Sequence, residues 1–262
     1  MVVGSISDTR VVLLVEYNGT GYHGSQYQVN APTIQGEIEK ALQKLTGEKI
    51  RIAAASRTDA GVHAEGQVIS FRTDSALPEK SFIDGLNYYL PRDIAVKKAF
   101  RAAGSFDVRR RAVSREYRYC LLNSATRSPM REGYSYRVTG DLDIEAMNRA
   151  CRALVGKHDF ASFVSSAETA RRKITVRNVL KAELTRQEDM VIFDIIANSF
   201  LPHQVRNIVG SLIRVGQGKM TVEEFHGMVE AGTPGLAGPT APADGLCLVR
   251  VNYPGPFEGE AK

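Results

Sequence analysis

Cysteine is scarce in this sequence, and the few that occur lie far apart. Cys120, Cys151 and Cys247 are odd in number, and none of them belongs to a CxxC pair. A disulfide framework or a structural zinc site needs closely spaced cysteines, so the sequence argues against both. We expect each cysteine to be a small buried apolar residue in a reducing compartment.

Long apolar runs are also missing. No stretch reaches the roughly 18 residues that a membrane span needs, and Met1–Ser7 lacks the charged start and apolar run of a signal peptide. We therefore expect a soluble cytoplasmic protein with no membrane partner. The 262 residues are 43% hydrophobic, enough for a sizeable core in one large or two small domains. The formal net charge of +5 is a mild bias toward polyanions.

The pattern of apolar and polar segments predicts an α+β fold. In the first half, the expected order is strand, helix, two strands, helix and strand. These elements are expected at Arg10–Tyr17, Thr33–Leu45, Ile50–Ala55, Gln67–Arg72, Pro78–Leu90 and Ile94–Arg101. The βαββαβ order is the ferredoxin-like arrangement.

The second half, from Gly104 onward, resembles the first in element order without a sequence repeat. The expected elements are a strand at Arg115–Leu122, a helix at Asp143–Leu154, a hairpin of Thr175–Thr185 and Met190–Ala197, helices from Pro202 and Val222, and a strand at Leu246–Val251. We predict two domains, 1–103 and 104–262. Each is expected to be a ferredoxin-like (RRM-like) half, with antiparallel sheets side by side, helices on one face and a central cleft.

Asp59 is the acidic residue best placed for chemistry. It follows an expected strand, and Gly61 lets the backbone turn tightly beside it. Arg57 and His63 flank it, and nearby cations keep a carboxylate ionised at neutral pH. Such a carboxylate can serve as base, nucleophile or metal ligand. The alternative is a structural Asp59 that caps a turn and pairs with Arg57.

His63 and the loop Asn18–Gln26 are expected to be structural. His63 follows Asp59 by four positions, but the sequence offers no third ligand nearby, as a catalytic zinc site requires. We expect His63 to hold its loop by hydrogen bonding. The loop Asn18–Gln26 contains glycines but lacks the GK[ST] ending of a phosphate-binding P-loop. A turn-rich loop is expected there.

Basic residues form two clusters. They are Arg101, Arg109, Arg110, Arg111, Arg115 and Arg118 in the first, and Arg171, Arg172, Lys173 and Arg177 in the second. In the first cluster, Tyr117 and Tyr119 alternate with Arg118, so on a strand the tyrosines share one face. Arginine with interleaved aromatics suits RNA, because cations contact phosphates and rings stack on bases. The alternative is a solvated charged face.

Arg206 lies beside the expected buried stripe of its helix, between Val205 and Ile208. An unpaired buried charge is costly, so Arg206 needs a partner, and a carboxylate in a cleft is the natural one. The alternative is an arginine whose stem packs while its head reaches water.

Several segments together resemble the tRNA pseudouridine synthase A (TruA) family over nearly the whole chain. The most specific is Arg57-Thr58-Asp59-Ala60-Gly61-Val62-His63-Ala64. The others are residues 16–26, 115–119, 156–163, 200–210 and 241–246.

The resemblance implies an isomerase that converts uridine to pseudouridine in the anticodon stem-loop of tRNA, at positions 38 to 40. By the same resemblance, Asp59 is the catalytic aspartate and Arg206 pairs with it. Tyr117 stacks on the target uracil and assists removal of the C5 proton, while Arg57 helps to take the nucleotide out of its stack. Three routes stay open for Asp59: attack on the ribose, attack on C6, or abstraction of the 2′ proton.

The resemblance also implies the partners. It implies no metal, no organic cofactor, and a homodimer that grips one tRNA across both subunits. The basic clusters add further expected RNA contacts at Arg109, Arg110, Arg111 and Arg172.

Two departures from the family pattern and two rival functions stay open. Ser25 stands where bacterial relatives often have Trp, and Gln204 where they often have Met. Both are expected to alter packing near the tRNA without touching the chemistry. One rival is a non-catalytic RRM-like RNA-binding protein, although an aromatic RNP1 signature is not evident. The other is a metal-dependent hydrolase that uses Asp59 and His63.

Overall fold

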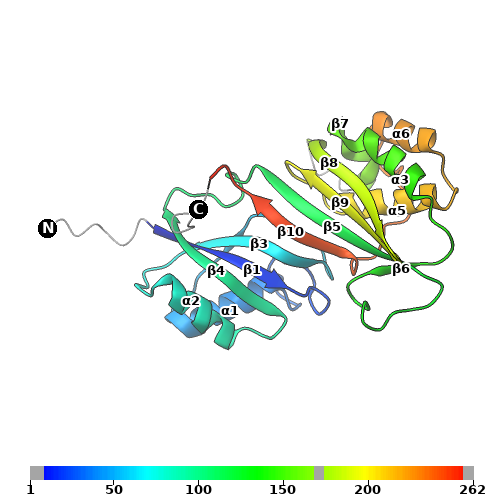
Figure 1. Cartoon of the computed structure of the whole chain (residues 1–262). Coiled ribbons are helices and arrows are strands. Elements are labelled where there is room, and N and C mark those ends of the chain that lie inside the picture. The colour runs from blue at the N-terminus through cyan, green and yellow to red at the C-terminus, as the bar shows by residue number, and fades with distance from the viewer. Residues whose placement is uncertain (1–8, 168–173, 256–262) are drawn as a thin grey trace. The chain divides into compact units, whose positions relative to one another are not determined.

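The computed structural model describes residues 9–167 and 174–255 (Figure 1). The chain folds as two compact units, Met1–Val113 with Leu248–Lys262, and Ser114–Cys247. Both units combine helices with β-strands, so the predicted α+β class is confirmed. Within the described ranges, no helix is both long enough and apolar enough to cross a membrane.

The first unit is built around β1 (Thr9–Tyr17), the strand expected at the start of the chain. β1 pairs antiparallel with β4 (Ile94–Ala103) on one side and with β3 (His63–Arg72) on the other. The short β2 (Ala53–Ala54) and the late strand β10 (Leu246–Asn252) are further neighbours of β3. The apolar run of β1 is buried at Val11, Val12, Leu13 and Val15.

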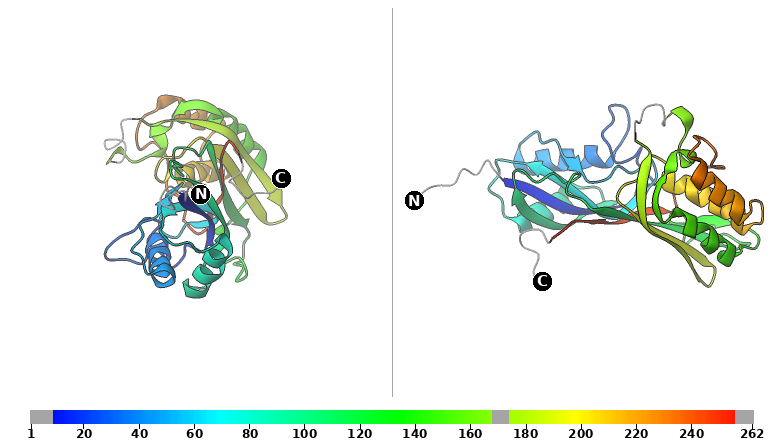
Figure 2. Two further views of the ribbon diagram at one scale, coloured as in Figure 1. Left: turned by 90° about the vertical axis from the view of Figure 1, so that its left-hand side faces the viewer. Right: turned by 90° about the horizontal axis from the view of Figure 1, so that it is seen from above.

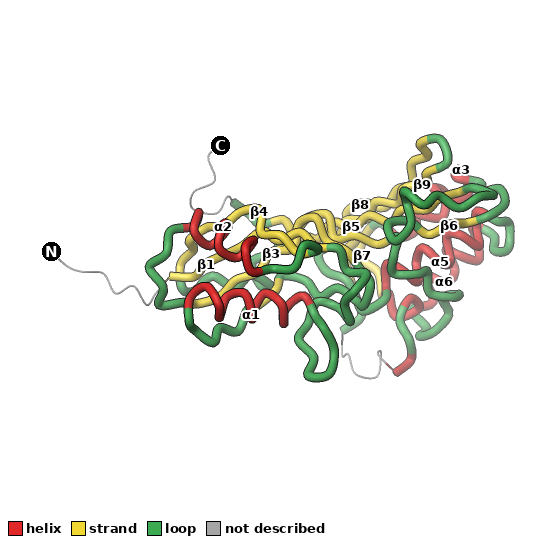
Figure 3. Tube along the Cα trace, turned by 90° about the horizontal axis from the view of Figure 1, so that it is seen from below, coloured by secondary structure: helices red, strands yellow, loops and turns green. Residues whose placement is uncertain are grey.

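Two helices, α1 (Ile34–Thr46) and α2 (Glu79–Tyr89), lie on one face of this sheet (Figure 3). α1 begins after Thr33, which caps it: the Thr33 Oγ1 accepts a hydrogen bond from the Gly36 N–H at 3.2 Å. This bond satisfies one of the amides that a helix start leaves without an intrahelical partner. The apolar face of α1 is buried at Ile34, Ile38, Ala41 and Leu42, while Leu45 is half-buried.

The second unit has a sheet in the order β5 (Ser114–Asn123), β9 (Met190–Ala197), β8 (Val176–Gln187) and β7 (Gly156–Asp159). Neighbours in this order run antiparallel, and the short β6 (Tyr136–Val138) runs parallel to β5. The predicted hairpin between β8 and β9 is confirmed.

Helices cover one face of the second sheet (Figure 2). They are α3 (Ile144–Cys151), α5 (Gln204–Gly216) and α6 (Val222–Ala231). A short 3₁₀ turn, Arg152–Leu154, continues α3, and another, Phe160–Phe163, follows β7. The predicted core stripe of α5 is buried at Val205, Ile208, Val209, Leu212 and Ile213.

The division between units differs from the boundary expected after residue 103. The segment before β5 stays with the first unit, because the Val113 N–H donates to the Asn252 carbonyl at 2.8 Å. The Tyr253 hydroxyl also donates to the Val108 carbonyl at 2.6 Å. As a consequence, most of β10 and the arginines at 109–111 belong to the first unit, although we expected them in the second domain.

The strand expected at Ile50–Ala55 is much shorter in the structure. β2 consists of Ala53 and Ala54, opposite Ser70 and Ile69 of β3, and the next amide, the Ala55 N–H, donates to the Val68 carbonyl of β3 at 2.8 Å. Just before β2, the Ile52 N–H donates to the Glu39 carboxylate of α1 at 3.1 Å, so a helix side chain replaces a strand partner. β3 in turn begins at His63 rather than at Gln67. The loop that carries Asp59 therefore runs directly from β2 into β3.

Candidate active site

Asp59 lies in a tight loop between β2 and β3. Its side chain is half-buried, and its backbone carbonyl accepts a hydrogen bond from the Val62 N–H at 3.2 Å. Gly61 has a φ of 80°, in the left-handed region that favours glycine, and its N–H donates to the Tyr22 carbonyl at 3.2 Å. The predicted tight turn at Gly61 is confirmed, and it ties the Asp59 loop to the loop Asn18–Gln26.

The two loops approach each other backbone to backbone. A Cβ placed on Gly19 would collide with the Val62 carbonyl, and Gly24, with a φ of 93°, would bring a Cβ to 3.0 Å from the Thr58 carbonyl. The Ser25 N–H donates to that same Thr58 carbonyl at 3.0 Å. The glycines that the sequence places in a turn-rich loop thus allow a close approach of two chain segments.

Ser25 adds a side-chain bond to this approach. Its Oγ accepts from the Thr58 N–H at 2.8 Å, and both residues are buried. We expected the departure from Trp at Ser25 to affect only packing. The structure instead places its hydroxyl on the backbone of the residue before Asp59, so a side chain outside the specific motif helps to fix the loop.

A buried polar cluster supports the other side of the loop. The Tyr17 hydroxyl and Thr58 Oγ1 are 2.8 Å apart, and the Gln67 amide donates to the Ser56 carbonyl at 2.9 Å. Gln67 Oε1 also accepts from the Ser56 N–H at 3.3 Å, while its Nε2 lies 3.4 Å from the Tyr17 hydroxyl. Gln67 is only 2% exposed. Because buried polar groups are costly unless paired, this cluster favours one conformation of residues 56–58.

Two further side chains hold the loop Asn18–Gln26. His63 is buried, and its Nδ1 accepts from the Gly19 N–H at 3.1 Å, which confirms the predicted structural hydrogen bond. The Tyr22 hydroxyl donates to Asp93 at 2.7 Å. Burial, followed by the bond to Asp93, raises the pKa of Tyr22 above its ordinary value, so the hydroxyl keeps its proton.

Among the described residues, no group of three or more His, Cys, Asp and Glu side chains is arranged to hold a metal ion.

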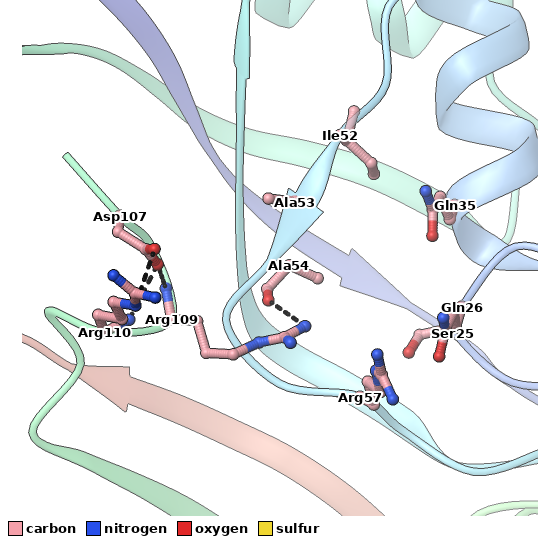
Figure 4. A pocket seen from close by; sticks show the side chains of 10 residues that line it. All are labelled: Ser25, Gln26, Gln35, Ile52, Ala53, Ala54, Arg57, Asp107, Arg109 and Arg110. Carbon is pink, nitrogen blue, oxygen red and sulfur yellow. Dashed lines mark hydrogen bonds and ion pairs between the residues drawn. The ribbon is translucent and has the colours of Figure 1, made fainter. Parts of the chain in front are cut away.

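Arg57 is exposed and lines a pocket of about 560 Å³ in the first unit (Figure 4). Arg109 and Arg110 line the same pocket, so the structure brings together three arginines that the sequence offered as RNA contacts. Asp59 is not among the lining residues. The third arginine of the run, Arg111, is exposed but does not line the pocket.

Tyr117 and Tyr119 share one face of β5, as predicted, and both are buried. The ring of Tyr117 meets that of Phe200 edge to face, with centroids 5.1 Å apart. Tyr119 donates its hydroxyl to the Pro242 carbonyl at 2.7 Å, and burial raises its pKa. On the opposite face, Arg118 pairs with Asp194, its cross-strand neighbour on β9, at 2.9 Å.

Arg206 lies in the first turns of α5 and is half-buried. Its Nε donates to the Ala241 carbonyl at 2.8 Å, and its Nη1 lies 3.3 Å from His203 Nδ1. The Ala241 N–H donates back to the Arg206 carbonyl at 3.1 Å. The guanidinium is therefore held by the loop before β10.

Known protein families include one that this chain matches over most of its length. A model of a family described as tRNA pseudouridine synthase matches residues 13–109 and 150–254. The chain belongs to the tRNA pseudouridine synthase family. The predicted family and the predicted class of enzyme, an isomerase, are thereby confirmed.

Several relatives match this pseudouridine synthase over most of its length. It is 43% identical over 244 residues to tRNA pseudouridine synthase A of Geotalea uraniireducens (strain Rf4), covering 93% of this chain and 99% of that protein. It is 44% identical over 243 residues to tRNA pseudouridine synthase A of Acetivibrio thermocellus, with the same coverage of each. A solved archaeal box H/ACA Nop10–Cbf5 complex aligns with 79% of this chain and 44% of its own, at 9% identity and a TM-score of 0.39.

The expected site residues of this pseudouridine synthase are divided between its two units. Asp59 and Arg57 belong to the first unit, whereas Tyr117 and Arg206 belong to the second. Arg172 lies outside the described residues. The sequence reasoning missed Ser25, Tyr17 and Gln67 as supports of the Asp59 loop. A polar Gln67 within an apolar strand was the available signal.

Gln204, the second departure from the family pattern, is fully buried. Its Oε1 accepts from the Leu201 N–H at 2.8 Å, which closes the start of α5. Its expected effect on packing near the tRNA stays a prediction. The structure places it in the interior, where it shapes the turn that precedes Arg206.

Proposed function

We propose that this chain converts uridine to pseudouridine in the anticodon stem-loop of tRNA, at positions 38 to 40, with Asp59 as the residue that the reaction requires. Family membership supports uridine isomerisation in tRNA. The observation that carries the role of Asp59 is the buried hydrogen-bond cluster that fixes its loop. A turn that only needed a capping carboxylate would not require so many buried polar supports.

The reaction is an isomerisation, and a well-placed carboxylate and a held base can carry its central step. The N1–C1′ bond of uridine breaks, the C5–C1′ bond forms, C5 loses a proton and N1 gains one. An ionised carboxylate can attack or stabilise a sugar carbon, as it does in glycosidases. Asp59 is half-buried rather than enclosed, and the cluster around Ser56 and Thr58 fixes the backbone just before it.

The second unit supplies the rest of the proposed site. Tyr117 would hold the uracil by stacking and assist removal of the C5 proton, and Arg206 would pair with Asp59 and keep it ionised. This assignment requires the two units, each of ferredoxin-like plan, to face each other across a cleft. It is supported by the fixed Arg206 head and by the face of β5 that carries Tyr117. Arg57 would contact the RNA beside the target and help to extrude it.

The proposed partner is tRNA held by a homodimer, with the cytoplasm as the expected location. Arg109, Arg110, Arg111 and Arg172 would contact phosphates. The homodimer can be checked by light scattering of the purified protein, with and without tRNA. A mass of one chain under both conditions would contradict it.

The test of function is to map pseudouridine in a tRNA transcript after incubation with the purified protein. We expect modification at one or more of positions 38 to 40 with the unaltered chain. Asp59→Asn should bind tRNA with unchanged affinity but form no product. Turnover by Asp59→Asn at the unaltered rate would remove Asp59 from the mechanism. Binding without any modification by the unaltered chain would favour the rival, a non-catalytic RNA-binding protein.

A further inference from the structure

The pocket beside Arg57 has the composition of a site for an anionic ligand with a flat apolar part. We call it the arginine pocket. Its cations are Arg57, Arg109 and Arg110, opposed by the single carboxylate of Asp107. Ile52 and the two alanines of β2 supply apolar surface. Its volume, about 560 Å³, falls in the usual range of small-ligand pockets.

Asp107 holds the backbone of two of the arginines, and its single negative charge does not neutralise the three guanidinium groups. Its Oδ1 accepts from the backbone N–H groups of Arg109 and Arg110 at 2.9 and 3.0 Å. The bond from Arg110 is the main reason that the pKa of Asp107 lies below its ordinary value. Arg109 also reaches the Ala54 carbonyl at 3.4 Å. Figure 4 shows Arg57 between this guanidinium and the pair Ser25 and Gln26.

The amides of the pocket differ in what they can still bind. Both polar atoms of the Gln35 amide already have partners, because its Oε1 accepts from the Tyr27 N–H and its Nε2 donates to Glu39. Gln26 is exposed, and its side-chain amide has no hydrogen-bond partner among the described residues. An amide that offers both a donor and an acceptor can pair with the edge of a base. The pocket therefore combines cations, apolar surface and one available amide, which are the recognition elements of a nucleotide.

The position of the pocket ties it to Asp59. Arg57 and Asp59 are two residues apart, so their Cα atoms lie within roughly 7 Å of each other. A nucleotide whose phosphate contacts Arg57 in the pocket can therefore neighbour, on one strand, a nucleotide held at Asp59. Two flanking nucleotides of one strand fit this spacing better than two separate molecules.

We propose that the arginine pocket binds a second, unstacked nucleotide of the same RNA strand, next to the uridine that is isomerised. Its phosphate is bound by Arg57, Arg109 and Arg110, its base lies against β2, and Gln26 pairs with the base edge. The site binds the neighbouring nucleotide and so positions the strand beside the target uridine. This inference rests on the proposed function, since it takes the target uridine to be bound at Asp59.

The experiment measures RNA binding in the Asp59→Asn background, so that turnover does not interfere. The probes are anticodon stem-loop RNAs in which each nucleotide flanking the target is replaced, one at a time, by an abasic nucleotide. We expect one flanking replacement to weaken binding by about tenfold, as loss of one stacked base does. With Gln26→Leu, or with Ala53→Phe filling the pocket, the same replacement should change affinity less than about twofold.

Two further arms make the result decisive. Arg110→Gln should lower the slope of log affinity against log salt by about one, whereas Arg92→Gln, an exposed arginine of the same unit outside the pocket, should leave it unchanged. The inference is overturned if every abasic replacement has the same effect in the pocket variants as in the Asp59→Asn background. Failure of the proposed function is a separate result, namely no pseudouridine formed by the unaltered chain, whatever the binding data show.

Discussion

The hydroxyl of Ser25 accepts a hydrogen bond from the backbone N–H of Thr58 at 2.8 Å, one residue before Asp59. A second bond, from the Ser25 N–H to the Thr58 carbonyl, joins the same residues through backbone atoms alone. The loop that carries Asp59 is thus tied to a segment 33 residues earlier in the chain. Several consequences for activity can be measured.

Ser25→Ala removes the side-chain acceptor but keeps the backbone bond. We expect a stability loss of about 1–3 kcal/mol, because the Thr58 N–H is left buried without its partner. We expect kcat to fall with little change in KM, since the loop loses order beside the proposed catalytic Asp59. Ser105→Ala, at an exposed serine, is the control and should change neither quantity. Equal kinetics for the two variants would contradict a positioning role for Ser25.

Gln67→Leu tests the buried cluster from the opposite side of the loop. It deprives the N–H and carbonyl of Ser56 of their side-chain partners, so we expect about 1–3 kcal/mol lower stability and a reduced kcat. Gln67→Glu keeps an acceptor for the Ser56 N–H but cannot donate to its carbonyl, and it should be intermediate in rate. Urea unfolding and steady-state kinetics measure the two effects. A stability loss without any change in kcat would make Gln67 merely structural.

Tyr117→Phe removes the hydroxyl of Tyr117 and keeps its ring, so it tests the role of the hydroxyl alone. The ring contact with Phe200 is kept, so we expect tRNA affinity within about twofold of the unaltered chain. Tyr117→Ala removes the stacking surface and should cost about 1–3 kcal/mol of binding to the base. Only 6% of Tyr117 is exposed, so a base can stack on it only after neighbouring groups move. Full activity in Tyr117→Phe would exclude a required hydroxyl.

Arg206→Ala should slow the reaction strongly, by about a hundredfold if it removes a preorganised charge from the site. Arg206→Lys should not restore the rate, because a lysine lacks the Nε that donates to the Ala241 carbonyl. The matched control is Arg214→Ala, a half-buried arginine in the last turn of the same helix. Single-turnover rates compare the three variants. Normal turnover by Arg206→Ala would eliminate the proposed pairing with Asp59.

Local pattern was enough to predict the long elements. β1 contains a continuous apolar run, α1 and α5 have apolar residues at helical spacing, and Thr33 has the side chain that a helix start needs. β6 and β7 were not predicted, because strands of three and four residues carry too little pattern. The length of β2 was overestimated, because the Ile52 N–H bonds to the Glu39 carboxylate of α1 instead of to a neighbouring strand.

A candidate site could be proposed from the sequence where its residues are local. The segment around Asp59 holds a carboxylate, a glycine and a flanking arginine within a few residues, and the resemblance to a family rested on it. The supports of the loop could not be inferred, because Tyr17 and Gln67 are separated by 50 residues in the sequence. Hydrogen bonds between such distant residues depend on the register of β1 against β3, which no local pattern specifies.

The strand β10 returns to the first unit after the whole of the second has been made. On the ribosome, β3 therefore emerges long before its neighbour β10. The two strands are in close contact, because the Val249 backbone of β10 lies so near Gly66 of β3 that only a glycine fits there. Synthesis of the chain from its N-terminus cannot complete the first unit before the second has been translated. Catalytic competence should thus arise in one late step, and a nascent chain arrested before β10 would hold the Asp59 motif without a finished sheet to carry it.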